Sequence, residues 1–262
     1  DNPADYFNTI AYTGDDSQDV TGVGFQPDLV WVKARGNTYN HQLHDSVRGA
    51  TAGALFSNMN IAETSYEFDS FDSDGFTTDS SNVTGINGDT HTQVAWCWKA
   101  SGSTASNSNG TNITSTVDAN TTAGFSIVSY TGSGTTSDTV GHGLSSLDLL
   151  IVKSRDETDS WFVKHKDLAS SKNLNLDQTV AETDVTSAYS EGGLSNLSGN
   201  TFGFLDGTSD ANAVNESSEA HIAYCFKGVQ GFSKFGSYVG NGSSDGSTIW
   251  CGFSPAWVMI KR

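Results

Sequence analysis

Basic residues are scarce in this sequence: 13 Lys and Arg stand against 30 Asp and Glu in 262 residues, a formal net charge of −17. Nucleic acids and anionic membrane surfaces are bound through Lys and Arg, so we expect neither of them as a partner. No apolar run approaches the length that spans a bilayer. We therefore expect no membrane insertion.

Cysteine is also rare. The three residues Cys97, Cys225 and Cys251 are an odd number and form no closed disulfide framework. None of them has neighbours at the spacing of a zinc site or an activated nucleophile. We interpret Cys97 and Cys225 as buried free thiols within apolar strands, and we expect no cofactor apart from a calcium ion considered below.

The abundant residues are Ser, Thr, Asn and 28 Gly, whereas only 16% of the residues are charged. Such a mixture is poor in helix formers and rich in turn formers. Aromatic residues make up 11% of the chain, enough for packed cores. The composition therefore predicts an all-β protein with many loops.

One short stretch occurs three times, at spacings of about 110–120 residues, which marks a repeat protein. It is Gly24–Lys33 (GFQPDLVWVK), and it returns as Gly252–Lys261 (GFSPAWVMIK). A degraded copy, Gly143–Lys153, has one extra residue and Leu147 in place of the proline. An apolar run bounded by Gly and Pro predicts a strand that is buried on both faces.

Other strings repeat around this stretch. A strand ending in Gly precedes it at Phe7–Gly14, Phe125–Gly132 and Phe232–Gly240, and an apolar strand closes two of the copies at Val94–Lys99 and Ile222–Lys227. Six to eight short strands in about 100 residues predict tandem antiparallel β-sandwich units, jelly-roll or lectin-like. One face of the doubly buried strands then meets the second sheet of its unit, and the other face meets a neighbouring unit.

The predicted organisation is unit A over residues 1–100, a Gly/Ser/Asn-rich linker over 101–120, unit B over 121–229 and a partial third unit over 230–262. A partial sandwich leaves apolar surface and an open edge. Three explanations stay open: the unit is truncated, it packs on unit B as an extra layer, or a strand of another subunit completes it.

Several strings together resemble a repeat domain of unknown function that occurs in structural proteins of marine tailed bacteriophages. They are Gly24–Lys33, His44–Gly49, Asp72–Phe76, Val94–Lys99 and Gly231–Tyr238. The resemblance covers nearly the whole chain apart from the linker. It implies a virion-surface protein, namely a tail fibre, head fibre or decoration protein, and it transfers no catalytic residue.

Two groups of polar residues are candidates for metal binding or catalysis. Asp69, Asp72 and Asp74 precede a glycine and resemble part of a calcium loop, but the full ligand spacing is missing and unit B has Phe202 at the place assigned to Asp74. We interpret them as a solvated turn, with a weak Ca²⁺ site as the alternative. The run His44–Ser46 forms no catalytic triad, because neighbouring strand residues face opposite ways, and we interpret it as a polar turn.

Exposed tryptophan rings would support sugar binding, because aromatic faces stack on sugar rings. Four of the tryptophans lie in apolar strands and are expected in the core: Trp31, Trp96, Trp98 and Trp257. Trp161 follows Asp159 and Ser160 and is the expected exposed aromatic, with Tyr39, His41 and Arg48 as its partners in binding a glycan or another protein. No spacing among the acidic residues selects a carboxylate pair for glycoside cleavage.

The sequence thus predicts a non-enzymatic structural protein at a virion surface or outside the cell. Its expected partners are other virion subunits, in a homo-oligomer, and a host-surface glycan. Two alternatives stay open: a polysaccharide-degrading phage depolymerase, and a secreted bacterial adhesin or filament subunit with lectin-like units.

Overall fold

The computed structural model describes residues 2–65, 68–79, 85–185, 192–195, 197, 199–205 and 213–262. The protein is all-β, with antiparallel strands in several sheets and one short 3₁₀ helix, η1 (Pro3–Asp5). Among the described residues, no helix is long and apolar enough to cross a membrane. The fold class expected from the composition is therefore confirmed at this level.

Two sheets are built from the first 98 residues. Their strands are β1 (Phe7–Thr13), β2 (Gln18–Thr21), β3 (Leu29–Ala34), β4 (Gln42–Asp45), β5 (Phe68–Asp72), β6 (Gly75–Thr78) and β7 (Thr92–Trp98). The larger sheet has the order β1-β7-β3-β4, and the smaller has the order β2-β6-β5.

The remaining strands form an eight-stranded and a three-stranded sheet. They are β8 (Ala105–Asn107), β9 (Ser115–Asn120), β10 (Phe125–Thr131), β11 (Thr139–Gly141), β12 (Leu149–Ser154), β13 (Phe162–His165), β14 (Lys172–Asn175), β15 (Thr183–Asp184), β16 (Gly193–Ser195), β17 (Thr201–Leu205) and β18 (Ala220–Phe226). The orders are β15-β14-β13-β12-β18-β10-β9-β8 and β11-β17-β16.

The same order of strands occurs in both halves. The middle of the eight-stranded sheet, β10-β18-β12-β13, has the order of β1-β7-β3-β4, and β11-β17-β16 has the order of β2-β6-β5. Trp31 of β3 lies opposite Trp96 of β7, and Ile151 of β12 lies opposite Tyr224 of β18. Cys97 and Cys225 are both buried in the central strands β7 and β18, as expected.

Alternate residues of the doubly buried strands serve two different cores. Val30 and Val32 of β3 pack toward the sheet β2-β6-β5, whereas Leu29 and Trp31 pack into a cluster that also holds Ile151 of β12. We call this the shared cluster; its buried members come from β3, β4, β7, β10, β12, β13 and β18 and from the adjoining loops. The second face of β3 and of β12 therefore packs in a cluster that holds residues from both halves of the chain.

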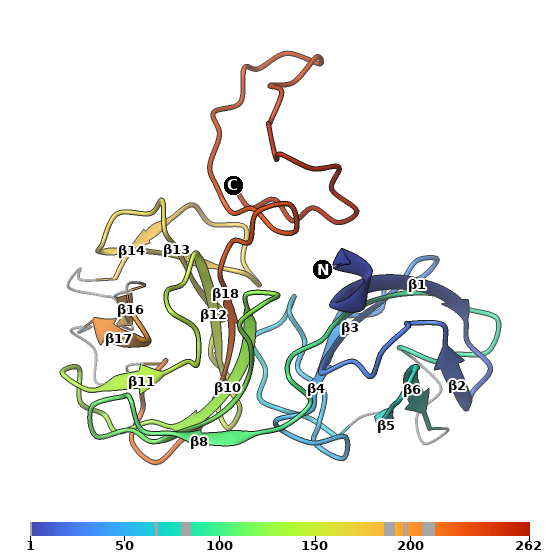
Figure 1. Ribbon diagram of the computed structural model, residues 1–262, viewed down its shortest axis with the longest axis horizontal. Helices are drawn as coiled ribbons and strands as arrows, with labels where there is room; N and C mark the ends of the chain where they lie inside the picture. Colours follow the sequence, from blue (N-terminus) through green and yellow to red (C-terminus); the bar gives the residue numbers. More distant parts are fainter. Residues whose placement is uncertain are drawn as a thin grey trace.

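Aromatic rings supply much of the shared cluster. Trp98 lies 6.4 Å, centroid to centroid, from Phe125 of β10, so the contact crosses from one half to the other. A buried aromatic ring removes roughly 150–250 Å² from water, worth about 4–6 kcal/mol before entropy losses. The two halves are therefore held together by a core of their own, and Figure 1 shows them side by side with their large sheets adjacent.

Two expectations about chain organisation are wrong. The linker over 101–120 is not a featureless loop, because β8 and β9 form a hairpin that extends the sheet beside β10, with Val117 buried under it. Residues 252–261, all of them described, form no strand. The difference lies in tertiary pairing, because β3 and β12 each pair with strands on both sides, whereas 252–261 pairs with none in the described part of the chain.

Candidate functional site

Trp161, expected to be exposed, is fully buried. Its indole Nε1 donates to the backbone oxygens of Phe56 and Met59, at 2.8 and 3.1 Å, and its ring stacks on Tyr224. The expectation is therefore wrong, and Trp161 is excluded from a glycan site. Asp159 and Ser160, the polar neighbours on which the expectation was based, precede β13, and the chain enters the shared cluster directly after them.

Arg48 is buried as well, with its side chain wholly covered. Its guanidinium donates to Asp45 at 2.6 Å, to Glu63 at 3.1 Å and to two backbone oxygens. Burial alone would lower the pKa of Arg48, but the charges of Asp45, Tyr224 and Glu63 outweigh it and raise the pKa further. The expected role of Arg48 in surface binding is wrong, because its Nε, Nη1 and Nη2 atoms all donate to groups inside the protein.

This arginine belongs to a polar network that joins the two halves. The hydroxyl of Tyr224 donates to Asp45 at 2.8 Å, and Arg155 donates to Glu63 at 2.7 Å. Backbone N–H of Glu63 also donates to the carbonyl of Arg155. Buried ions cost free energy unless they are paired, so each member depends on the others.

Tyr39 and His41 remain partly exposed but do not lie with the other two candidates. His41 Nδ1 accepts from Trp31 Nε1 at 3.0 Å, and its ring stacks on Trp96. The Tyr39 ring lies 5.6 Å from that of His91. The four residues predicted to bind together are therefore split between the molecular interior and the loop that joins β3 to β4.

The acidic triplet has separate hydrogen-bonding roles. Asp74 accepts from the backbone N–H groups of Gly22 and Gly24, and Asp72 accepts from Ser70 and Thr77. Among the residues that the structure describes, no three His, Cys, Asp or Glu side chains, Asp69 included, come close enough together to hold a metal ion.

The comparison of Asp74 with unit B also needs correction. Phe76 lies opposite Val20, and Phe202 lies opposite Val140, so Phe202 matches Phe76 rather than Asp74. The residue that matches Asp74 is Asn200, whose carbonyl accepts from the turn before β12 as that of Asp74 does before β3.

The run His44–Ser46 forms no triad, as expected, but it is not a polar turn. His44 and Asp45 end strand β4, and both are buried. The His44 ring stacks on Phe68, while the Asp45 carboxylate faces Arg48 on the other side. Burial, with the charge of Arg48, lowers the pKa of His44 to about 3, so the ring stays neutral.

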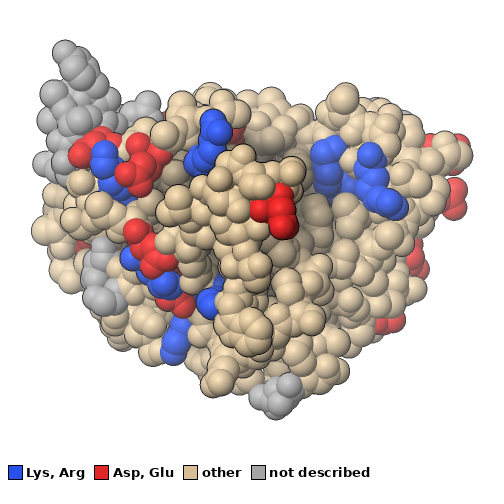
Figure 2. Space-filling model, turned by 90° about the horizontal axis from the view of Figure 1, so that it is seen from above, with Lys and Arg blue, Asp and Glu red and all other residues tan. Residues whose placement is uncertain are grey.

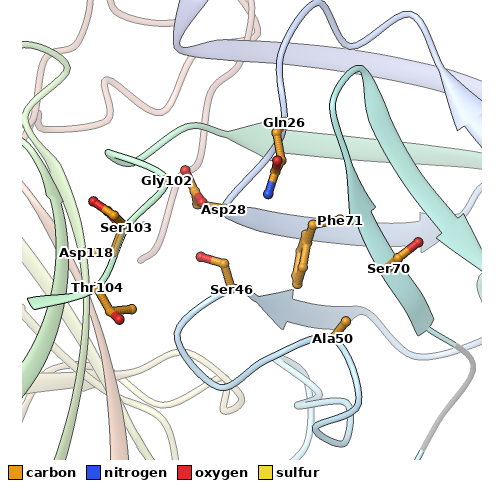
Figure 3. A pocket seen from close by; sticks show the side chains of 10 residues that line it. All are labelled: Gln26, Asp28, Ser46, Ala50, Ser70, Phe71, Gly102, Ser103, Thr104 and Asp118. Carbon is orange, nitrogen blue, oxygen red and sulfur yellow. The ribbon is translucent and has the colours of Figure 1, made fainter.

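A hollow of about 540 Å³ is lined by residues of the first half of the chain and by residues of the segment that follows β7. Its lining residues are Gln26, Asp28, Ser46, Ala50, Ser70, Phe71, Gly102, Ser103, Thr104 and Asp118. Figure 3 shows the residues of unit A facing the segment that carries Ser103 and Thr104. A wall of hydroxyls, one amide, two carboxylates and one aromatic ring is suited to a polar ligand.

The carboxylates of Asp28 and Asp118 are the strongest chemical feature of this hollow. Asp28 Oδ2 accepts from Ala100 N at 2.7 Å, and Asp118 Oδ1 accepts from the N–H and the hydroxyl of Ser101 at 2.7 and 2.5 Å. Both residues are 1% exposed. Burial, together with the charge of Asp118, raises the pKa of Asp28 to about 6.

The chain belongs to the DUF7483 family, a domain of unknown function, whose family model matches residues 2–262. No curated protein and no solved structure matches the chain.

Asp28 has a counterpart within the DUF7483 chain. Asp148 Oδ2 accepts from Gly228 N at 2.6 Å, as Asp28 Oδ2 accepts from Ala100 N. Each carboxylate caps the residue that follows a central strand, β7 or β18. The first role of Asp28 is therefore structural, and what distinguishes it from Asp148 is the hollow and the neighbouring Asp118.

The sequence carried a signal for one member of this pair. Asp28 and Asp148 occupy the same position in the repeated stretch, immediately before the buried strand. Asp118 gave no comparable signal, because it lies in a segment taken for a linker, and only the pairing of β9 with β10 brings it beside Asp28.

Proposed function

We propose that the chain is a tandem of two β-sandwich units of one design, followed by part of a third. Matched side-chain bonds support this beyond the strand order. The hydroxyls of Tyr12 and Tyr130 donate to the carbonyls of Ile86 and Val214, at 2.6 and 2.5 Å. Lys33 and Lys153 each fold back onto the carbonyl of the next residue and a second carbonyl in the following loop.

We infer that these units serve as a non-enzymatic scaffold of the virion-surface kind, a fibre or decoration protein that assembles with other subunits and adheres to a host glycan. The observation that carries the proposal is the shared cluster. It joins the two units through a buried core of their own and leaves the connecting loops at the surface, where binding residues commonly lie. The acidic surface favours solubility outside the cell and neutral or basic partners over anionic ones.

The hollow beside Asp28 is the proposed glycan site. Phe71 offers a ring face for stacking on a sugar, and Gln26, Ser103 and Thr104 offer donors and acceptors for its hydroxyls. Ligand sites occur preferentially at junctions between units, which is where this hollow lies.

Binding of the purified protein to host-envelope polysaccharide tests the adhesion. Saturable binding is expected, and Phe71→Ala should weaken it about tenfold, since a stacked ring contributes about 1 kcal/mol or more. Tyr39→Ala, in the loop that joins β3 to β4, is the control and should leave binding unchanged. Absence of binding to every envelope fraction would overturn the adhesion. Finding the protein in secreted fractions but not in virions would favour the bacterial adhesin instead.

A polysaccharide-degrading activity is the second candidate, and the pair Asp28 and Asp118 is the observation that favours it. A carboxyl whose pKa is raised to about 6 beside a second carboxylate matches the acid and its partner in glycoside hydrolysis. New reducing ends released from the polysaccharide, and lost in Asp28→Asn, would establish this activity. Binding without release would leave the scaffold proposal in place.

A further inference from the structure

The carboxylate of Asp118 is a feature of the hollow that the repeat does not explain. Asp28 and Asp148 occupy matching positions and accept from Ala100 N and Gly228 N, one in each half of the chain. Asp118 belongs to β9, which extends the eight-stranded sheet and has no counterpart in the order β1-β7-β3-β4. The capping of a central strand therefore accounts for Asp28 and leaves Asp118 without a role in the repeat.

The side chain of Asp118 is buried but only half satisfied. It is 1% exposed and lines the hollow. The backbone N–H and the hydroxyl of Ser101 both donate to its Oδ1, whereas no hydrogen bond from a described residue ends on its Oδ2. A carboxylate offers about four acceptor positions, and leaving an oxygen of a buried carboxylate unpaired costs free energy. A ligand in the hollow can supply the donor that Oδ2 lacks.

The two carboxylates also lack a basic partner inside the protein. Among the described residues, no ion pair includes Asp28 or Asp118, and no Lys or Arg lines the hollow. The charge of Lys99 acts on Asp28, but its Nζ lies over the ring of Phe25, 5.9 Å from the centroid. Burial and the charge of Asp118 raise the pKa of Asp28 to about 6, so the pair is short of positive charge.

The acidic excess of the chain does not by itself produce such a site. On the face shown in Figure 2, acidic side chains are scattered, and several of them lie beside Lys or Arg. Exposed charges of this kind are screened by water and salt, whereas buried charges are screened much less. The wall of the hollow can therefore select for positive charge where the open surface cannot.

The other lining residues indicate what carries the positive charge. The ring of Phe71 can stack on a sugar and also attracts a cation, and the hydroxyls of Ser103 and Thr104 suit the hydroxyls of a sugar. A bare metal ion is not favoured, because no three His, Cys, Asp or Glu side chains in the described part of the chain come close enough to hold one. A sugar that bears a protonated amine matches both the carboxylates and the rest of the wall.

We propose that the hollow selects glycans that carry a free amino group, with the ammonium donating to Asp118 and Asp28 while the sugar ring packs against Phe71. This inference rests on the proposed glycan site and adds the chemical class of the sugar, an unacetylated hexosamine. An ammonium has three N–H donors, enough to reach both carboxylates. N-acetylation removes its charge and two of these donors, and the same carboxylates repel an acidic polysaccharide.

A short oligomer of glucosamine and its fully N-acetylated counterpart are the probes, because they differ only at the amino groups. The glucosamine oligomer should bind at least about tenfold more tightly, since hydrogen bonds between charged groups are about twice as strong as those between neutral groups. Asp118→Asn should lower the ratio of the two affinities about tenfold. Asn keeps an acceptor for Ser101 N, and saturable binding of the acetylated oligomer by this variant shows that its hollow is intact.

Asp148→Asn is the matched control, because it removes the same charge from a capping aspartate that does not line the hollow. It should leave the ratio unchanged, which separates the hollow from the general attraction of a cation to a chain of charge −17. Equal affinities for the two oligomers, a ratio that Asp118→Asn does not change, or equally tight binding of a lysine oligomer would overturn the inference. Equal affinities that both fall in Phe71→Ala would leave the glycan site in place, whereas absence of binding to both oligomers and to envelope polysaccharide would remove that site as well.

Discussion

Replacing Asp28 by Asn is expected to stabilise the protein at neutral pH. Asp28 is 1% exposed, and its Oδ2 accepts from Ala100 N. Burial and the nearby charge of Asp118 oppose its ionisation, raising its pKa from 3.8 to about 6. An uncharged amide of the same shape keeps an acceptor for Ala100 N and removes the buried charge.

The pKa shift of Asp28 sets the magnitude and the sign of the expected change in the free energy of unfolding. A shift of roughly two units corresponds to about 3 kcal/mol between the two protonation states, as an upper limit. Because the folded state holds the proton more tightly than the unfolded state, the stabilisation by protonated Asp28 is complete below pH 3.8. It is lost as the pH rises through about 6. Asn forgoes a charge-assisted hydrogen bond of about 1 kcal/mol, which leaves a net gain of about 1–2 kcal/mol at pH 7.5.

Urea unfolding of the wild type and Asp28→Asn at pH 4.5, 6 and 7.5 measures this. The difference should favour Asn at pH 7.5 and shrink toward zero or reverse at pH 4.5, since other titrating groups cancel between the two proteins. Asp148→Asn removes the matched acceptor for Gly228 N and should show no gain at pH 7.5. A pH-independent difference, or an Asn variant that is less stable at pH 7.5, would refute the buried-charge argument.

Three further predictions follow, two at the junction of the halves and one inside the second half. Arg48→Met should cost about 3–5 kcal/mol by urea unfolding, since it strands the buried carboxylate of Asp45, whereas Arg155→Met, at a partly exposed position, should cost about 1 kcal/mol or less. Trp161→Ala should cost about 3–5 kcal/mol, and a loss below 1 kcal/mol would contradict its burial in the shared cluster. Gly132→Ala should destabilise by more than about 1 kcal/mol, because a Cβ there would lie 2.1 Å from the carbonyl oxygen of Glu216.

The strands were predictable where local pattern decides structure. The apolar runs that follow Gly24 and Gly143 form β3 and β12, because a nearly continuous apolar run suits a strand that is covered on both faces. The run behind Gly252 has the same pattern but is not a strand, since β structure needs partners for its backbone and pattern alone does not supply them. The β8–β9 hairpin was missed because its polar, Ser-rich strands lie at a sheet edge, where little apolar patterning is required.

The binding residues were harder to predict, because exposure depends on tertiary structure. Trp161 and Arg48 lie in polar surroundings along the sequence, yet both point into the junction of the two halves. Asp28 and Asp118 are 90 positions apart, and nothing in either local sequence indicates that they share one hollow. Pairs of this kind depend on how sheets stack, which a single sequence does not reveal.

The duplicated acceptor explains why the scaffold is the first proposal and the hydrolase the second. Asp28 and Asp148 each cap the end of a central strand, although only Asp28 borders the hollow. An acceptor oxygen at this position therefore serves the fold whether or not a substrate binds. Catalysis by Asp28 would have to be added to that structural role through Asp118, the member of the pair that the repeat does not account for. The hydrogen bond from Ala100 N already accounts for the presence of Asp28, so its position beside the hollow does not by itself assign it a catalytic role. Release of reducing ends that is lost in Asp28→Asn would assign that role.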